Sequence, residues 1–206
     1  FAITKENDTL KKEQNERTAL YNRKYSRKKA LEDLERSLEG YSRSVKMILS
    51  NSNLEGICGV VSKLLEVDAK YVTAIETAMG RAMQNIVVTN EKAAKNSIEY
   101  LKNSNGGRAT FMPLTSVSSS ALISPPSNDK GYIGIASSLI EYDKKYDGIF
   151  KYLLGKTVIC DNLDNATAIA KKHGYKFRIV TLDGQVVNAG GSFTGGSADK
   201  HSGLIS

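Results

Sequence analysis

The chain contains an internal repeat, which limits its fold more than any other feature of the sequence. The stretch GICGVVSKLLEVDAKYVTAIETAMG (56–80) aligns without gaps with GYIGIASSLIEYDKKYDGIFKYLLG (131–155), and nine of the 25 aligned positions are identical. The alignment resumes after a short deletion, where NIVVTNEKAA matches KTVICDNLDNA. Two copies are too few for a solenoid, in which successive repeats stack on one another. We therefore predict two similar half-domains related by a pseudo-twofold axis.

Both copies carry the same succession of strand and helix signals. A glycine-led strand runs into an acidic turn and a helix, and a β-branched strand and a second helix follow. The first copy ends in a glycine turn and a strand that Pro113 terminates, and the second ends in a hairpin about Asp183–Gly184. The expected fold class is α+β with two lobes. The expected elements are strands at 59–65, 134–140, 86–89 and 157–160, helices near 91–103 and 165–173, and a helix with Val72, Ile75, Met79 and Met83 on one face.

Residues 1–50 predict a long helix, because they contain no proline, one glycine (Gly40) and many Glu, Lys, Arg and Leu residues. A seven-residue frame places apolar side chains in two adjacent rows, which is the spacing of a coiled coil. The rows contain Leu31, Leu38 and Val45 beside Leu34, Tyr41 and Ile48, and Leu10 and Leu20 fit the same frame. A single helix is marginally stable in water, so a partner helix is expected. The alternative is an amphipathic helix that lies on the domain.

The Ser/Pro-rich stretch TSVSSSALISPPSNDKG (115–131) predicts a connector between the two copies. With the repeat and the long helix, it divides the chain into five segments. These are a coiled-coil arm at 1–50, a first lobe at 51–114, the connector at 115–130, a second lobe at 131–197 and the start of a returning arm at 198–206.

The segment GGSFTGGS (190–197) has four glycines in eight positions and admits three interpretations. A phosphate-binding loop needs a lysine followed by Ser or Thr directly after its glycines, and no lysine follows here until Lys200. A flexible linker is less compatible with the lone aromatic Phe193 between the glycine pairs. The third interpretation, which we favour, is an edge strand that contacts a second chain, with glycines that let two backbones approach.

No constellation of residues predicts an enzyme in this segment. The two histidines lie 28 residues apart without a metal-binding pattern, and there is no CxxC motif. Cys58 and Cys160 lie in apolar strand patterns, where a buried, inert thiol is expected. Glu66 and Asp68 recur in the second copy as Glu141 and Asp143, which favours a turn and helix cap kept in both copies over a catalytic pair of carboxylates.

The composition is typical of a globular chain, and the net charge favours an anionic partner. Hydrophobic residues make up 40% of the 206 residues, and no apolar run approaches the roughly 20 residues that span a bilayer. Two cysteines are too few for a disulfide framework, which predicts a reducing cytoplasm. The formal net charge is +7, and the pI is near 9.3. Nucleic acid is therefore the first partner to consider.

Several motifs in fixed order resemble the hinge, with its adjoining coiled coil, of a bacterial-type SMC (structural maintenance of chromosomes) protein. The matching text is LEDLERSLEGYSRSVKMIL, GICGVV, AIETAMGRAMQNIVV, GRATFMPL, LLGKTVI, RIVTLDG and GGSFTGGS, and it spans residues 30–197. The resemblance implies a two-lobed domain that forms a homodimer, with the glycine-rich signature at the dimer contact. The interface residues expected on this basis are Gly190, Gly191, Ser192, Thr194, Gly195, Gly196, Arg108 and Thr110.

The resemblance also implies partners and a cellular setting. It implies weak, salt-dependent and sequence-neutral contact with single- or double-stranded DNA, accessory condensin-type subunits, no membrane, and a cytoplasmic, nucleoid-associated location. ATP and Mg are expected in head domains outside this segment, which itself needs no cofactor or metal. The alternative functions are a DNA-binding adaptor in which dimerisation is secondary and a nucleotide-dependent enzyme that uses the glycine loop. The DNA-binding candidates are Arg43, Lys46, Lys171, Lys172 and Lys200.

Overall fold

The computed structural model describes residues 2–37 and 40–196, with the side chains of residues 11–29 and 40–196. The chain divides into an N-terminal unit, Phe1–Tyr41, and a larger unit, Ser42–Ser206. No helix in the part of the chain that the structure describes is both long enough and apolar enough to cross a membrane.

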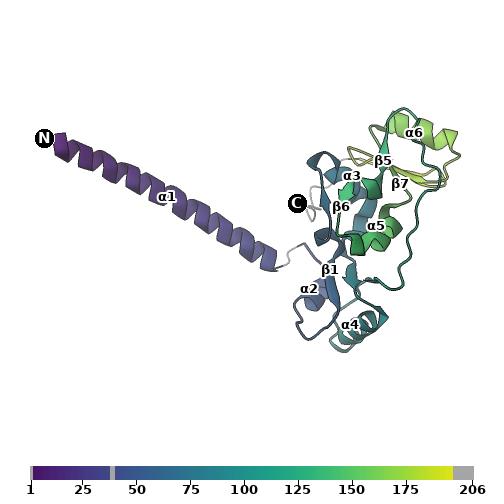
Figure 1. Ribbon diagram of the computed structural model, residues 1–206, viewed down its shortest axis with the longest axis horizontal. Helices are drawn as coiled ribbons and strands as arrows, with labels where there is room; N and C mark the ends of the chain where they lie inside the picture. The colour runs from purple at the N-terminus through teal and green to yellow at the C-terminus, as the bar shows by residue number, and fades with distance from the viewer. Residues whose placement is uncertain (1, 38–39, 197–206) are drawn as a thin grey trace. The chain divides into compact units, whose positions relative to one another are not determined.

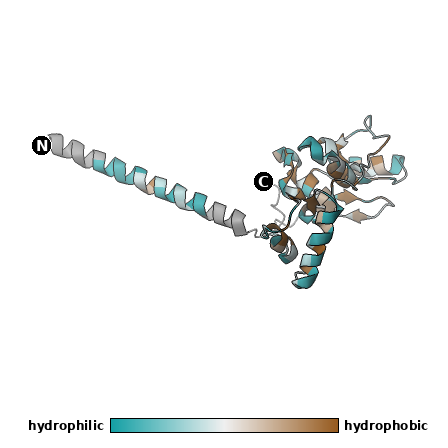
Figure 2. Ribbon diagram, turned by 60° about the horizontal axis from the view of Figure 1, so that its bottom comes forward, coloured by the Kyte–Doolittle hydropathy of each residue, from teal (hydrophilic) through white to brown (hydrophobic). Residues whose placement is uncertain are grey.

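The N-terminal unit contains one long helix, α1 (Ala2–Ser37) (Figure 1). All its described side chains, at residues 11–29, are exposed, and most of these residues are hydrophilic (Figure 2). The apolar exceptions include Leu20, Tyr21 and Tyr25, and the two tyrosine rings stack with their centroids 6.2 Å apart. Such a helix needs a partner for stability. The predicted seam residues Leu10, Leu31, Leu34 and Leu38 lie outside the described side chains, so the coiled coil stays a prediction.

The expectation of a single helix over residues 1–50 is wrong in its last part. Helix α1 ends at Ser37, and a separate helix, α2 (Arg43–Leu49), begins in the larger unit. Gly40 has a left-handed φ of +93°, which cannot continue a right-handed helix. Val45 and Ile48 of the predicted seam are buried, and α2 packs against α4. The alternative interpretation, an amphipathic helix on the domain, therefore applies to this part of the chain.

The two-lobed α+β fold is confirmed in the larger unit (Figure 1). Each copy of the repeat builds strand, short strand, helix, strand, helix and strand in the same order. Lobe 1 contains β1 (Ile57–Val60), β2 (Glu66–Val67), α3 (Val72–Met79), β3 (Ile86–Val88), α4 (Glu91–Asn103) and β4 (Phe111–Pro113). Lobe 2 contains β5 (Tyr132–Ile135), β6 (Ile140–Glu141), α5 (Asp147–Leu154), β7 (Thr157–Cys160), α6 (Leu163–Lys172) and β8 (Arg178–Thr181), followed by β9 (Val186–Val187) and β10 (Phe193–Thr194).

Equivalent side chains cap equivalent helices in the two lobes. Asn90 and Asn162 accept hydrogen bonds from backbone N–H groups three residues later and thereby cap α4 and α6. Asp68 accepts from the Lys70 N–H, and Asp143 accepts from the Lys145 N–H. The hydrogen bonds from the two lysine side chains, followed by these backbone bonds, lower the pKa of both aspartates. The predicted cap is confirmed for Asp68 and Asp143, each of which caps a 3₁₀ turn, whereas Glu66 and Glu141 lie in strands β2 and β6 and cap nothing.

The expected strands at 59–65 and 134–140 are interrupted. A 3₁₀ turn follows β1 at Val61–Lys63 and β5 at Ala136–Ser138. The consecutive residues Val60 and Val61 are both buried, whereas successive side chains of a regular strand point to opposite faces. Each continuous apolar stretch of sequence therefore forms a strand followed by a buried turn.

The two lobes share a strand order and a core. Lobe 1 has the order β1-β3-β4, and lobe 2 has the equivalent order β5-β7-β8, extended by β9 and β10. In both lobes the first pair is antiparallel and the second is parallel. Strands β2 and β6 form a separate antiparallel pair that joins the lobes, with Glu66 opposite Glu141. One hydrophobic cluster contains Ile75 and Met79 of lobe 1 and Phe150 and Leu154 of lobe 2, so the lobes fold as one unit.

Arg178 at the start of β8 anchors lobe 2 to a helix of lobe 1. Its guanidinium donates hydrogen bonds to the Ala78 carbonyl at 2.9 Å and to the Thr77 carbonyl at 3.2 Å. These carbonyls belong to the last turn of α3, where a cation interacts favourably with the helix dipole. Burial lowers the pKa of the Arg178 guanidinium. The side chain therefore caps α3 from the opposite lobe.

The connector is fastened to lobe 2 at its end. Asp129 accepts a hydrogen bond from the Lys172 ammonium, and its other carboxylate oxygen lies 2.6 Å from His173 Nε2. Lys172 lies in the last turn of α6 and His173 is its C-cap, and only 9% of the Asp129 side chain is exposed. The bond from Lys172, followed by that from His173, lowers the pKa of Asp129. The carboxylate is thus held in its charged form.

We predict that Arg178→Ala lowers the free energy of unfolding by about 2 kcal/mol, because two charged hydrogen bonds to the end of α3 are lost. Arg81→Ala is the matched control, since Arg81 is exposed and lies just after the same helix. Urea unfolding followed by circular dichroism measures both changes. Equal stability of the two variants would show that the Arg178 side chain does not stabilise the contact between the two lobes.

We also predict that Asp129→Asn destabilises the protein at neutral pH and has little effect at low pH. A carboxyl with a lowered folded-state pKa contributes stability above its unfolded pKa of about 3.9, and this contribution disappears as pH falls through the folded value. Melting temperatures of the wild type and the variant should therefore converge below about pH 4. Glu99→Gln on the exposed face of α4 serves as control, and a constant difference across the pH range would contradict the prediction.

Candidate dimerisation surface

The glycine-rich segment forms a tight turn and a strand at the edge of the lobe 2 sheet. Gly190 and Gly191 have φ values of +85° and +95°, which side-chain-bearing residues rarely adopt. The turn closes through the Asn188 N–H, which donates to the Ser192 carbonyl at 2.8 Å. The Gly190 N–H donates to the Tyr175 carbonyl at 2.9 Å. The segment is therefore ordered, and a flexible linker does not describe it.

Strand β10 has an open outer edge with an exposed aromatic residue. Phe193 lies opposite Val187 of β9. This pair stands between two hydrogen-bonded pairs of the ladder, one of which is Asn188 with Ser192. Alternation in an antiparallel ladder turns the Phe193 N–H and C=O away from β9. No further strand pairs with β10 in the described residues, and 52% of Phe193 is exposed.

Strand β4 has a second open edge, on lobe 1. The Ile86 N–H donates to the Thr110 carbonyl and the Leu114 N–H donates to the Val88 carbonyl, both at 2.9 Å. Alternation along this parallel ladder turns the Phe111 N–H and C=O outward. Pro113, which cannot donate a backbone hydrogen bond, also fits an edge position.

The repeat shows which edge of lobe 1 lacks a neighbour. In lobe 2 the strand equivalent to β4 is β8, and its outer edge is covered by β9. In the part of lobe 1 that the structure describes, no strand occupies the equivalent place beside β4. The two open edges therefore lie on different sheets of the same chain.

The predicted interface residues fall at these two edges. The six residues of the glycine-rich segment lie in the β9–β10 turn, in β10 or just after it, and apart from half-buried Gly191 they are well exposed. Arg108 and Thr110 are exposed and directly precede β4. The prediction did not include Phe111 and Phe193. The lone aromatic between two glycine pairs was the signal for Phe193, whereas Phe111 had no comparable signal.

The predicted DNA-binding residues do not form a single patch. Arg43 and Lys46 lie together on α2, and Lys171 and Lys172 lie at the end of α6. Helices α2 and α6 are at opposite ends of the larger unit (Figure 1). Lys172 is engaged by Asp129. Lys200 lies outside the described residues.

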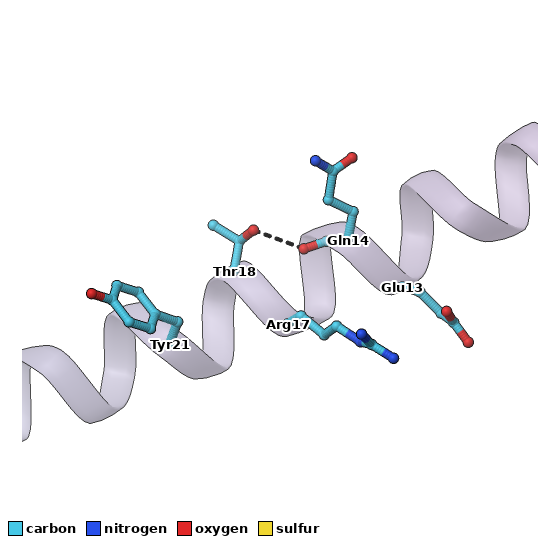
Figure 3. A pocket seen from close by; sticks show the side chains of 5 residues that line it. All are labelled: Glu13, Gln14, Arg17, Thr18 and Tyr21. Atoms are coloured by element: carbon cyan, nitrogen blue, oxygen red, sulfur yellow. Dashed lines mark hydrogen bonds between the residues drawn. The ribbon is translucent and has the colours of Figure 1, made fainter.

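Other candidate features include a half-buried thiol, Cys58, a buried thiol, Cys160, and an open hollow on α1. Burial raises the pKa of the Cys160 thiol to about 11 and also raises that of Cys58. Among the described residues, no three His, Cys, Asp or Glu side chains gather as metal ligands. A hollow on α1 is lined by side chains of this one helix, so it is an open surface feature (Figure 3). Its lining residues are Glu13, Gln14, Arg17, Thr18 and Tyr21, with a Thr18 hydroxyl bond of 2.7 Å to the Gln14 carbonyl.

A known family model matches more than half of the chain. The family model described as SMC proteins Flexible Hinge Domain matches residues 54–170. This range contains lobe 1, the connector and most of lobe 2.

Curated relatives carry the name Chromosome partition protein Smc. The protein of Halothermothrix orenii is 42% identical over 199 residues, which cover 95% of this chain and 17% of that protein. The protein of Bacillus subtilis is 39% identical over 180 residues, which cover 85% of this chain and 15% of that protein. This chain thus spans about one sixth of the length of these relatives.

Solved structures of hinge domains share the fold. The asymmetric dimer of the Geobacillus stearothermophilus SMC hinge domain has a TM-score of 0.81 and 39% identity, with 93% of this chain and 82% of that chain covered. The Pyrococcus furiosus SMC protein hinge domain has a TM-score of 0.66 and 33% identity, with 80% and 85% covered.

Proposed function

This chain belongs to the flexible hinge domain family of SMC proteins, and on this premise we propose that it is the homodimerisation hinge of a chromosome-partition ATPase. The observation that carries the proposal is the presence of two open strand edges, β4 and β10, on different lobes of one chain. The dimeric state named for the Geobacillus stearothermophilus relative supports it.

The two edges supply complementary halves of one contact. Each exposes backbone donors and acceptors that can extend a sheet by pairing with a strand of another chain. The β4 edge presents the Phe111 backbone, and the β10 edge presents the Phe193 backbone with its exposed ring. We infer that β10 of one chain approaches β4 of the partner.

A pair of chains then makes this contact twice. Lobe 1 of each chain meets lobe 2 of the other, which gives a closed isologous dimer with twofold symmetry. Full separation requires both contacts to break, so the dimer is more stable than one contact alone implies. A closed ring of this kind holds two coiled-coil arms together, and α1 is the start of one arm.

The remaining activities belong to the longer protein. ATP and Mg act in its head domains, and accessory condensin-type subunits bind the assembled protein. The hinge segment itself performs no catalysis in this proposal. The cellular site is the cytoplasm, in association with the nucleoid.

Accessory DNA binding is supported by charge. The net charge of +7 favours contact with phosphates, and the exposed Arg43 and Lys171 lie on the two basic helices α2 and α6. The contact would be sequence-neutral, since phosphates carry no sequence information. The alternative is a DNA-binding adaptor in which DNA drives assembly. The two open edges favour the dimerisation hinge, because they need no nucleic acid.

We predict that the wild-type chain sediments as a dimer at nanomolar concentration without DNA and that Phe193→Asp sediments as a monomer. The aspartate places a charge in the centre of the contact and removes the apolar ring. Ile123→Asp is the matched control, because Ile123 is 98% exposed on the connector. Phe193→Asp is preferable to Gly191→Asp, which would strain the turn at φ +95°.

A wild-type chain that is monomeric at micromolar concentration would overturn the dimerisation proposal. Dimerisation of the wild type only after addition of DNA would favour the adaptor instead. Sedimentation at several concentrations, with and without DNA, separates these results.

We predict that affinity for single-stranded DNA falls steeply as salt rises, and that the double variant Arg43→Gln, Lys46→Gln reduces the slope of log K against log salt. Each lost phosphate contact should lower the magnitude of this slope by about 0.7. Lys171→Gln tests α6 separately, and Lys92→Gln on the exposed face of α4 is the control. Affinity that does not change between 50 and 200 mM salt (roughly the range over which phosphate contacts weaken) would exclude this mode of binding.

A further inference from the structure

Two hydrogen bonds join the side chain of Gln185 to the backbone of Gly196, which lies two residues after β10. Its Nε2 donates to the Gly196 carbonyl at 3.1 Å, and its Oε1 accepts from the Gly196 N–H at 2.9 Å. The amide therefore satisfies the donor and the acceptor of one residue, as a neighbouring strand would do. Gln185 itself directly precedes β9.

Gly195 leaves the space that this side chain occupies. A Cβ at position 195 would overlap Oε1 of Gln185. The φ of Gly195 is outside the left-handed range, unlike those of Gly190, Gly191 and Gly196, so its backbone accepts an alanine. The need for glycine at this position therefore comes from Gln185 of the same chain.

Strand β10 needs such support because it contains two residues and, among the residues that the structure describes, pairs with β9 alone. Asn188 Nδ2 lies 3.2 Å from both the Ser192 and the Thr194 hydroxyl oxygens. Gln185 fixes the far end of the strand, after Thr194. Both ends of the exposed edge are thus held by amide side chains.

We propose that Gln185 is a positioning residue that holds the β10 edge in the extended geometry needed to pair with a second copy of this chain. This inference rests on the proposed dimerisation, and it assigns to Gly195 an internal role instead of close approach by the partner backbone. Gln185 acts through Gly196 and β10, and direct contact with the partner is not required.

A double-mutant cycle tests the proposal. Gln185→Ala removes both bonds to Gly196, and Gly195→Ala displaces the Gln185 side chain by overlap. Each single variant should raise the dimer dissociation constant about tenfold or more, since an edge that is no longer held extended must lose conformational entropy on pairing. The double variant should be no weaker than Gln185→Ala alone, because both changes act on the same contact. Gln185→Glu, which keeps the acceptor for the Gly196 N–H, should restore part of the affinity.

Two further measurements separate positioning from general stability. The Gly196 amide should be protected from hydrogen exchange in the wild type and unprotected in Gln185→Ala. In the monomeric Phe193→Asp background, Gln185→Ala should leave the melting temperature within about 2 °C, because surface changes have small effects.

The outcomes are distinct. Unchanged dimer affinity of Gln185→Ala, despite loss of Gly196 protection, would overturn the positioning role. Further weakening by Gly195→Ala in the Gln185→Ala background would also overturn it and would assign Gly195 to contact with the partner. A monomeric wild type with a protected Gly196 amide would overturn the dimerisation proposal, and with it the role of Gln185 in pairing, while the bond itself would stand.

Discussion

Backbone N–H and C=O groups at a strand edge require hydrogen-bond partners, and this requirement explains how a duplicated chain becomes a pairing module. Both copies build a three-stranded sheet of the same order. Lobe 2 covers its third strand, β8, with the hairpin strand β9, whereas lobe 1 leaves β4 uncovered in the described residues. The difference between the copies lies in the text after the repeat, where RIVTLDGQVVN continues into the glycine-rich segment. Duplication supplies the matching scaffolds, and in the proposed dimer the added hairpin of one chain supplies the strand that lobe 1 of the other lacks.

The shared core matters because it fixes the positions of the two strand edges relative to each other. Two contacts close a ring only if β4 and β10 are held at a fixed separation, since a loose pair of lobes would allow open chains of molecules. Phe150 and Leu154 of lobe 2 pack in the same cluster as Ile75 and Met79 of lobe 1. The β2–β6 pair and the Arg178 bonds to the end of α3 join the lobes at two further places. The pseudo-symmetric core thus fixes the edges that the proposed dimer would use.

Local signals predicted the parts of the fold that depend on nearby residues. The Asp68 and Asp143 caps, the Asp183–Gly184 hairpin and the order of elements in the repeat all follow from short spacings in the sequence. The packing of α2 against α4 and the buried turn after Val60 depend on residues far along the chain, which periodicity does not reveal. Gly80 and Gly155 are identical in the repeat but differ in structure. Gly80 has φ +50°, whereas Gly155 has φ −68° and is covered by the connector backbone at Ser120.

The four glycines of GGSFTGGS show why composition alone could not locate the contact. Gly190 and Gly191 serve the turn of their own chain, and Gly195 gives room to Gln185. The glycines at these positions are required by contacts within the chain, so they are no evidence that a partner lies against them. It is evidence that the β10 edge is ordered before a partner arrives. An edge that is already extended loses less conformational entropy on pairing, and in the proposed dimer the free energy of burying Phe193 is then available for association.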